Sequence, residues 1–337
     1  MSLFRKASAF LAAGVVLASA SLAAAAPAKE VTIAYQDMWN PYRTVIASQE
    51  IEKATGWKIN WKLFGGGADV IRALASGDVA IGEAGSSPIA AGVSQGIDVS
   101  LFWILEDINS AEALVVRDGI KAPQDLRGKK IATPFVSTSH FHLLFALEQF
   151  GLKPADVQLV NLRPAEIAAA WERGDIDGAF IWDPSLAKLK QNGHVLITSG
   201  QLSSWGKSTF DGIVVNKKFA KENPDFVAAF VKAIAAADSR YRQDPSKWTA
   251  ASEDVAAIAK LTGGKAEDIP AGLALYGFPT PDEQVSAKWL GGGKDGGAAK
   301  ALLFTAQFLK EQGRITDVLP DYAGAVDPSF AQKALAK

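Results

Sequence analysis

Strand-like apolar runs alternate with helical patterns between residues 31 and 215, and this alternation restricts the fold more than any other feature of the sequence. Residues 57–63 alternate apolar and polar side chains, whereas residues 68–76 carry apolar side chains at helical spacing and end at Gly77. Such alternation predicts an α/β fold with parallel sheets that helices cover on both faces. The predicted strands are residues 31–35, 57–63, 79–81, 99–105, 113–116, 130–133, 157–162, 178–182, 195–198 and 212–215.

An internal repeat indicates that the chain forms two related lobes. Residues 73–79 and 170–176 each end a helical pattern and begin a strand through a Gly-Asp pair. The first strand leads to Ser87-Pro88 and the second to Asp183-Pro184, so both would place a strand end before a helix that opens with proline. Chance similarity between two helix–glycine–strand units is the alternative explanation.

The segment after residue 215 is predicted to be helical, with helices at residues 224–242, 252–263 and 298–312 and a flexible glycine-rich surface loop at 291–297. We expect this tail to pack back onto the first lobe, so the chain would cross between the lobes near residues 115–118 and 209–215. The predicted domains are lobe I, residues 27–115 plus 213–337, and lobe II, residues 116–212. A hinge and a ligand cleft would lie between them.

Residues 1–26 have the pattern of a secretory signal peptide. Arg5 and Lys6 precede an apolar run over residues 9–22, and small residues at 23–28 offer cleavage sites. An uncleaved anchor is the alternative, although the run is short for a membrane span. The chain has no cysteine, which removes the usual attachment point of a lipid anchor. We therefore expect a freely diffusing periplasmic protein.

Charge patterning argues against two classes of partner. The formal net charge is −1, and acidic and basic residues are mixed along the chain without a block of Lys or Arg. Nucleic acid and membrane surfaces both attract proteins through clustered positive charge. Neither is therefore an expected partner.

Two stretches place small hydroxyl residues between a strand end and a helix start. They are Gly85-Ser86-Ser87-Pro88 and Ser137-Thr138-Ser139-His140. The first N–H groups of a helix lack internal partners and carry partial positive charge, so such stretches can bind an anion. Simple helix capping by serine and threonine is the alternative for each stretch alone. One stretch in each half of the chain favours an anion-binding cleft.

Other residues at predicted strand ends and crossings suit a cation instead. Glu112 and Asp211 supply negative charge, and the indoles of Trp182 and Trp205 can form cation–π contacts. Solvated surface acids and a core tryptophan are the alternative interpretations. Together with the anion-binding stretches, these residues predict a site for a small zwitterion.

Catalytic signatures are not found in the sequence. There is no Cys nucleophile, and His140 and His142 are two residues apart, so they would face different sides of a helix. Neither a P-loop nor a dinucleotide-binding glycine motif occurs. We therefore expect no catalytic residues, no metal and no cofactor, and a protein that is not an enzyme.

Seven segments of the sequence resemble one known family. They are residues 31–36, 70–78, 85–88, 112–116, 134–140, 168–178 and 305–313. They are similar to the taurine-binding members of the nitrate/sulfonate/bicarbonate-type solute receptors of bacterial ABC importers. The resemblance covers nearly all of the chain after the signal peptide. It implies a type II periplasmic-binding-protein fold of two Rossmann-like lobes that close over taurine or a closely related short aminosulfonate.

The resemblance also implies partners and roles for residues. The partners would be an inner-membrane permease and its cytoplasmic ATPase, and the receptor would be a monomer. Glu112 and Asp211 would face the amine, and Trp182 and Trp205 would form walls. The positions of the family's pocket motifs are occupied here by Gln36, Gly66, Ser86, Ser87, Ser137, Thr138 and His140.

Two candidate site residues depart from the family pattern. Asp37 follows Gln36 where the family has small residues, and Asp183 stands where the family often has alanine. Two added carboxylates near the cationic end favour a different amine or a more positive ligand. A receptor for an alkanesulfonate or another zwitterion, an enzyme on the same fold, and a sensor input domain are the alternative functions.

Overall fold

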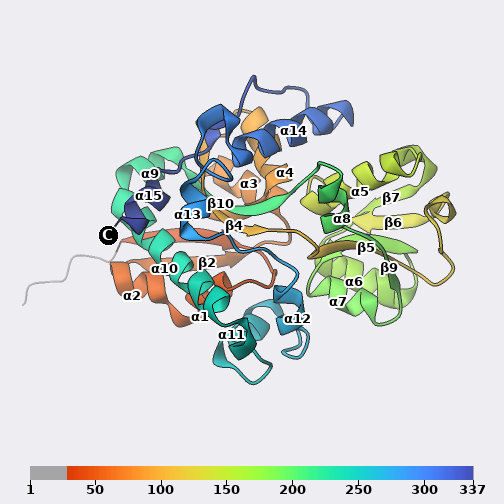
Figure 1. Cartoon of the computed structure of the whole chain (residues 1–337), viewed down its shortest axis with the longest axis horizontal. Coiled ribbons are helices and arrows are strands. Elements are labelled where there is room, and N and C mark those ends of the chain that lie inside the picture. The colour runs from red at the N-terminus through yellow and green to blue at the C-terminus, as the bar shows by residue number, and fades with distance from the viewer. Residues whose placement is uncertain (1–28, 337) are drawn as a thin grey trace, which may run out of the picture.

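The computed structural model describes residues 29–336 as two α/β lobes that lie side by side along the long axis of the molecule (Figure 1). Each lobe is built on a five-stranded sheet. The predicted two-lobed α/β architecture is therefore confirmed. The predicted signal peptide lies outside the described residues.

The first lobe has the strand order β2-β1-β3-β10-β4. Its strands are β1 (Glu30–Tyr35), β2 (Lys58–Leu63), β3 (Ile81–Gly85), β4 (Val99–Asp107) and β10 (Phe210–Asn216). The helices among these strands are α1 (Tyr42–Ser48), α2 (Glu50–Thr55), α3 (Gly67–Ser76) and α4 (Ser86–Ser94). Val214 and Val215 of β10 are fully buried, as expected for a central strand that is covered on both faces.

The second lobe has the strand order β7-β6-β8-β5-β9. Its strands are β5 (Glu112–Val116), β6 (Lys130–Thr133), β7 (Gln158–Asn161), β8 (Gly178–Trp182) and β9 (His194–Thr198). Its helices are α5 (Thr138–Gln149), α6 (Pro164–Arg173), α7 (Ser185–Lys190) and α8 (Ser199–Ser204). β3 and β8 hold the same central position in their sheets, so the internal repeat read from the sequence marks equivalent strands.

The sheets are mixed, and the prediction of wholly parallel sheets is wrong. β10 runs antiparallel to β3 and β4, and β5 runs antiparallel to β8 and β9. Both reversed strands are the first that the chain forms after it passes from one lobe to the other. Their buried apolar runs read like those of parallel strands, because burial on both faces gives the same pattern in either direction.

The chain passes between the sheets at residues 108–111 and again at 205–209. The predicted boundaries at residues 115 and 213 fall inside β5 and β10, a few residues further along the chain. The two crossings lie side by side, since the Ile108 N–H donates to the Thr209 carbonyl over 3.3 Å. Each crossing contains a left-handed residue, Asn109 (φ 45°) and Gly206 (φ 97°). Short connections of this kind can act as a hinge.

The tail after β10 is helical within the described residues and packs back on the first lobe (Figure 1). Its helices are α9 (Lys217–Glu222), α10 (Pro224–Gln243), α11 (Glu253–Thr262), α12 (Ile269–Leu273), α13 (Pro281–Val285), α14 (Gly297–Glu311) and α15 (Ser329–Leu335). α10 packs against α1 and α2, and α14 packs against α4. Phe308 of α14 also reaches lobe II, where its ring centre lies 5.0 Å from that of Phe141.

The glycine-rich segment before α14 is a tightly folded turn, and the prediction of a flexible loop there is wrong. A Cβ on Gly296 would lie 2.0 Å from the carbonyl oxygen of Gly291, and one on Gly297 would lie 1.9 Å from that of Lys288. These glycines allow the backbone to approach itself closely. Glycine-rich segments occur both in flexible loops and in crowded turns, so the sequence alone does not distinguish the two.

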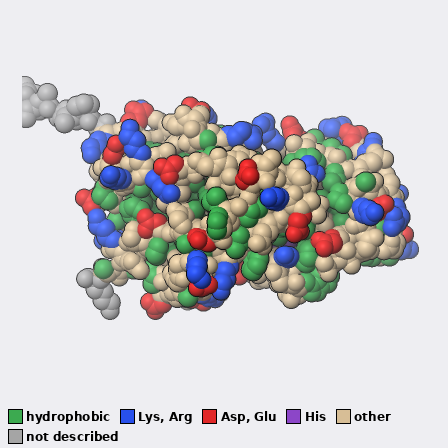
Figure 2. All heavy atoms as spheres, turned by 90° about the horizontal axis from the view of Figure 1, so that it is seen from above, with side chains coloured by type: hydrophobic (Ala, Val, Ile, Leu, Met, Phe, Trp, Pro, Cys, Tyr) green, Lys and Arg blue, Asp and Glu red, His purple; other side chains and the backbone are tan. Residues whose placement is uncertain are grey.

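Basic and acidic side chains are interspersed with apolar ones over the face that Figure 2 shows. This distribution agrees with the mixed charge pattern of the sequence. Among residues 29–336, no helix combines the length and the apolar character that crossing a bilayer requires.

Candidate ligand-binding site

A cavity of about 10 Å³ lies between the two lobes, next to both crossings. It has room for about one water molecule. Its walls come from strand ends and helix starts of both lobes, where α/β proteins commonly bind their ligands. The lining residues are Gln36, Met38, Gly67, Gly85, Pro88, Glu112, Ser137, Thr138, Trp182 and Asp211.

Two helix starts meet at this cavity. α4 begins after Gly85, which offers no capping side chain, so the first N–H groups of α4 lack a partner within the helix. α5 is capped by Ser137, whose Oγ accepts from the His140 N–H over 3.1 Å. A Cβ on Gly85 would lie 2.7 Å from Cγ2 of Thr138, which shows that the two helix starts are in contact across the lobes. The arrangement favours an anion at this end of the cavity.

Two carboxyl groups occupy the same cavity. Burial raises the pKa of Glu112 to about 7, against the opposing effect of hydrogen bonds from Thr138 (2.6 Å) and Ser199 (3.4 Å). Burial also raises the pKa of Asp211 well above its ordinary value, and the nearby charge of Glu112 adds to the rise. Removal from water disfavours the charged form of both groups. A cation bound beside them would therefore stabilise their ionised forms.

One buried cation is present among residues 29–336, and it is already paired. The guanidinium of Arg43 donates to both carboxylate oxygens of Glu83 over 2.8 and 2.7 Å, and both side chains are fully buried. Glu106, whose Oε1 accepts from Asn40 over 3.3 Å, is also buried, and burial together with the charge of Asp211 raises its pKa. The carboxyl groups around the cavity thus outnumber the cations. A ligand ammonium would supply the missing charge.

A hydrogen-bonded chain links Glu112 to the second crossing. Ser199 Oγ lies 2.7 Å from His142 Nδ1, and His142 Nε2 lies 2.7 Å from the carbonyl oxygen of Lys207. The carbonyl can only accept, so Nε2 carries the proton. Burial lowers the pKa of His142 to about 4, so the ring is neutral at pH 7 and its Nδ1 is an acceptor. The single hydroxyl proton of Ser199 is donated either to this Nδ1 or to the Glu112 carboxylate. This chain holds Ser199 beside the Glu112 carboxyl group.

Six of the predicted site residues line the cavity together: Gln36, Glu112, Ser137, Thr138, Trp182 and Asp211. The other seven lie outside its lining, and their roles in binding stay predictions. Gly66 lines a neighbouring surface pocket that also reaches Ser137. Trp205 is half exposed at the end of α8.

The remaining five are largely held in local contacts. The Ser86 Oγ accepts from the Phe210 N–H over 3.5 Å, and the buried Ser87 Oγ has no hydrogen-bond partner among the described residues. Burial raises the pKa of Asp37, which lies close to the Trp182 indole, and raises that of Asp183 to about 6.

His140 is the fifth, and it is not a cationic ligand for an anion. Its ring stacks on Phe135, with ring centres 4.6 Å apart, and its Nδ1 accepts from the Val136 N–H over 3.1 Å. Burial lowers its pKa to about 3, so the ring is neutral.

Sequence reasoning missed several parts of the site. Met38 lines the cavity, and the Arg43–Glu83 pair lies behind it. Glu83 could have been noticed, because an acid inside an apolar strand requires a buried partner. No sequence pattern would have identified Arg43 as that partner.

Comparison with known proteins agrees with this architecture. The family model described as NMT1/THI5-like matches residues 52–247. The taurine-binding periplasmic protein of Escherichia coli (strain K12) is 41% identical over 94% of this chain and 98% of its own length. The chain belongs to the NMT1/THI5-like family. A second relative, the putative aliphatic sulfonates-binding protein of the same strain, is 30% identical over 61% of this chain and 63% of its own length.

Comparison with solved structures identifies the fold class of this chain. The periplasmic aliphatic sulphonate binding protein SsuA of Escherichia coli has a TM-score of 0.67 at 27% identity and covers 90% of this chain and 91% of its own. The alkanesulfonate-binding protein SsuA of Xanthomonas axonopodis pv. citri, solved with bound MOPS, has a TM-score of 0.71 at 23% identity, covering 86% and 96%. The predicted periplasmic-binding-protein fold and the predicted family are confirmed.

Proposed function

We propose that this chain is the periplasmic substrate-binding component of an ABC importer and that it binds taurine or a closely related short aminosulfonate. The observation that carries the proposal is the composition of one cavity. The start of α4, where Gly85 offers no capping side chain, lines the same cavity as Glu112 and Asp211. A sulfonate suits the first and an ammonium suits the second. The 41% identity to a taurine-binding protein supports the same ligand.

The proposed mechanism is closure of the lobes over the ligand. A cavity of about 10 Å³ is too small for an aminosulfonate, so the lobes must move apart about the crossings at 108–111 and 205–209 to admit it. The ligand then favours closure only to the extent that it binds the closed arrangement better than the open one. Contacts from both lobes, such as Asp211 and Thr138, provide that difference.

Binding without catalysis is part of the proposal. The chain contains no cysteine, the buried His140 and His142 have lowered pKa values, and both ring nitrogens of His142 are engaged in hydrogen bonds. Ser137, the serine that lines the cavity, donates to the Pro134 carbonyl over 2.6 Å and caps α5. No group of His, Asp and Glu among the described residues is arranged to hold a metal ion. These features support a receptor rather than an enzyme.

The location and the partners follow from the same function. The N-terminal sequence pattern and the periplasmic relatives support export to the periplasm. There the closed monomer would dock on an inner-membrane permease that cytoplasmic ATPase subunits drive. Measurement of the mature protein's mass in solution and reconstitution with its permease would test these two points.

Calorimetry with matched ligands tests the ligand assignment. Taurine and ethanesulfonate have similar sulfonates, but ethanesulfonate lacks the ammonium. Glu112→Gln and Asp211→Asn should each weaken taurine binding by about 2–5 kcal/mol, the usual loss when one partner of a buried charge pair is removed. Ethanesulfonate binding should weaken far less. Equal losses for both ligands would refute the assignment of the acids to the amine, and failure of the unmodified protein to bind taurine would refute the ligand.

A further inference from the structure

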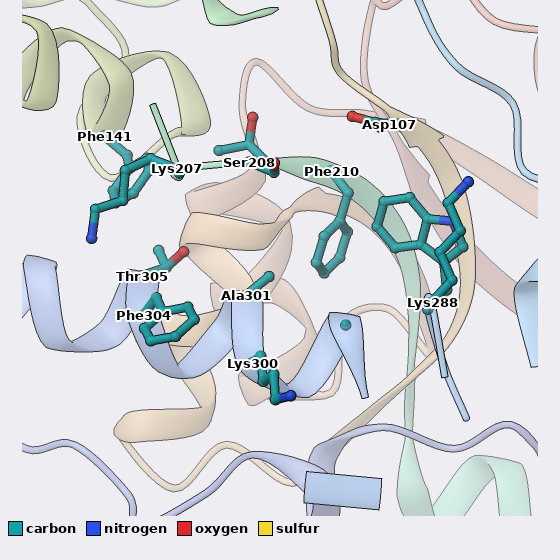
Figure 3. A pocket seen from close by; sticks show the side chains of 14 residues that line it. Asp107, Phe141, Lys207, Ser208, Phe210, Lys288, Lys300, Ala301, Phe304 and Thr305 are labelled. Atoms are coloured by element: carbon teal, nitrogen blue, oxygen red, sulfur yellow. The ribbon is translucent and has the colours of Figure 1, made fainter. Parts of the chain in front are cut away.

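A second cavity, of about 350 Å³, lies where the second crossing meets α14 (Figure 3). This volume lies near the lower end of the range of small-molecule sites, and it is far larger than the narrow polar space between the lobes. Figure 3 shows Ala301 and Thr305 on the side of α14 that faces Ser208 and Phe210. The cavity is separate from the cleft, since none of its lining residues also lines the cleft cavity.

Both lobes and their connection contribute to this hinge pocket. Phe141 belongs to α5 of lobe II, Phe304 belongs to α14 of the tail on lobe I, and Lys207 belongs to the crossing. The contact between Phe308 and Phe141 joins α14 to lobe II about one helical turn beyond Phe304. A molecule in the hinge pocket would therefore touch every part whose relative position changes when the lobes move.

The walls of the hinge pocket combine aromatic surface with three lysines and one acid, Asp107. Phe304 is 49% exposed and therefore presents much of its ring to solvent. Lys207, Lys288 and Lys300 lie around it, and no ion pair within the described residues occupies Lys207 or Lys300. The Nζ of Lys207 lies 5.9 Å from the ring centre of Phe304. An aromatic surface beside unpaired lysines suits an anion with an apolar body.

Unused hydrogen-bonding groups point to the same conclusion. Thr209 lines the hinge pocket, is 1% exposed, and its Oγ1 has no hydrogen-bond partner in the described structure. The indole N–H of Trp289, another lining residue, is likewise buried without a partner. Buried polar groups normally find partners, so either group is free to pair with a polar ligand atom that reaches it.

We propose that the hinge pocket binds an amphipathic organic anion: a small molecule with an aromatic or branched apolar body and one acidic group. The apolar body packs against Phe304 and Phe141, and the acidic group lies between Lys207 and Lys300. The ligand class differs from that of the cleft, where space is small and carboxyl groups dominate. The site does not depend on the ligand proposed for the cleft.

Fluorescence titration of the mature protein with anilinonaphthalenesulfonate tests the hinge pocket, because this probe is an aromatic body that carries one sulfonate. Saturable binding of one probe per chain is expected. Lys300→Glu and Phe304→Ser should each weaken it at least tenfold; both side chains are exposed, so thermal melting should confirm that the variants fold. Lys310→Glu, an exposed position on the same helix outside the pocket, makes the same charge change and should leave probe binding unaltered.

Two further arms separate the possible results. Phenylnaphthylamine, which lacks the sulfonate, should bind at least tenfold more weakly than the anionic probe; equal affinity would overturn the assignment of an anion. Glu112→Gln should leave probe binding unchanged, and a parallel loss would place the probe in the cleft and overturn the hinge pocket. The proposal is also overturned if the unmodified protein shows no saturable binding, or if Lys310→Glu weakens the probe as much as Lys300→Glu.

Discussion

The raised pKa of Glu112 predicts that taurine binds more tightly as the pH rises. In the empty protein this pKa is about 7. A ligand ammonium favours the ionised carboxylate, so binding below pH 7 must release the proton that Glu112 holds. Affinity should therefore fall by nearly tenfold for each pH unit below the pKa and level off above it. Between pH 8 and pH 5 the loss from this one group is about 100-fold, or about 2.7 kcal/mol.

Calorimetry across this pH range, in buffers with different ionisation enthalpies, measures both the affinity and the number of protons released. The sulfonate and the ammonium of taurine do not titrate between pH 5 and pH 8, so the change reports on the protein. Asp211, whose pKa is also raised, can add to the slope. Glu112→Gln should therefore lower the slope by about one proton without necessarily removing it. An affinity that does not depend on pH, or equal slopes in the two proteins, would contradict the reasoning.

Two other predictions concern stability and closure. Both carboxylate oxygens of Asp238 are buried without hydrogen bonds, and burial raises its pKa to about 7, so the folded protein loses stability as the pH rises from about 4 to 7. In denaturant titrations, Asp238→Asn should raise the free energy of unfolding by up to about 4 kcal/mol at pH 8 and by little at pH 4. An equal effect at both pH values would argue against this cause. Gly85→Ala should weaken taurine binding at least tenfold with an unchanged melting temperature, because its Cβ would lie 2.7 Å from Thr138 in the other lobe. Gly119→Ala is the control, because a Cβ at this position would have no other part of the structure within 4 Å. Equal taurine affinities of Gly85→Ala and the unmodified protein would show that the lobes do not close this tightly.

Periodicity was sufficient to predict most strands, although the strand predicted at residues 79–81 overlaps β3 (Ile81–Gly85) at one residue only. It did not predict how the strands are arranged. The apolar run before residue 117 correctly predicted β5, yet it did not say that this strand belongs to lobe II and runs antiparallel to β8. Both properties depend on pairing between segments far apart in the chain. The turn at Gly296 shows the same limit at short range, since its glycines reflect crowding by Gly291 and not freedom of the backbone.

For the site, sequence could predict which edge of each sheet carries polar groups, because strand ends meet at one edge. It could not predict which side chains turn into the cavity. Asp183 directly follows Trp182, but only the tryptophan lines the cavity, while the Asp183 Oδ1 accepts from the Ala187 N–H over 2.8 Å. Trp205 was assigned by its nearness to the second crossing, yet α8 leaves it half exposed. Neighbouring residues in a chain often face different environments, and only packing decides which.

The surplus of negative charge around the cleft has a consequence for the energy that transport uses. If the lobes shut on Glu112 and Asp211 with no cargo between them, two carboxylates would leave water with no counter-ion in exchange. The ligand-free receptor therefore favours an open conformation, and a ligand with an ammonium group removes this preference. A permease that recognises only the closed conformation would then not hydrolyse ATP for ligand-free receptors. The residues that select the ligand would in this way also prevent futile ATP hydrolysis.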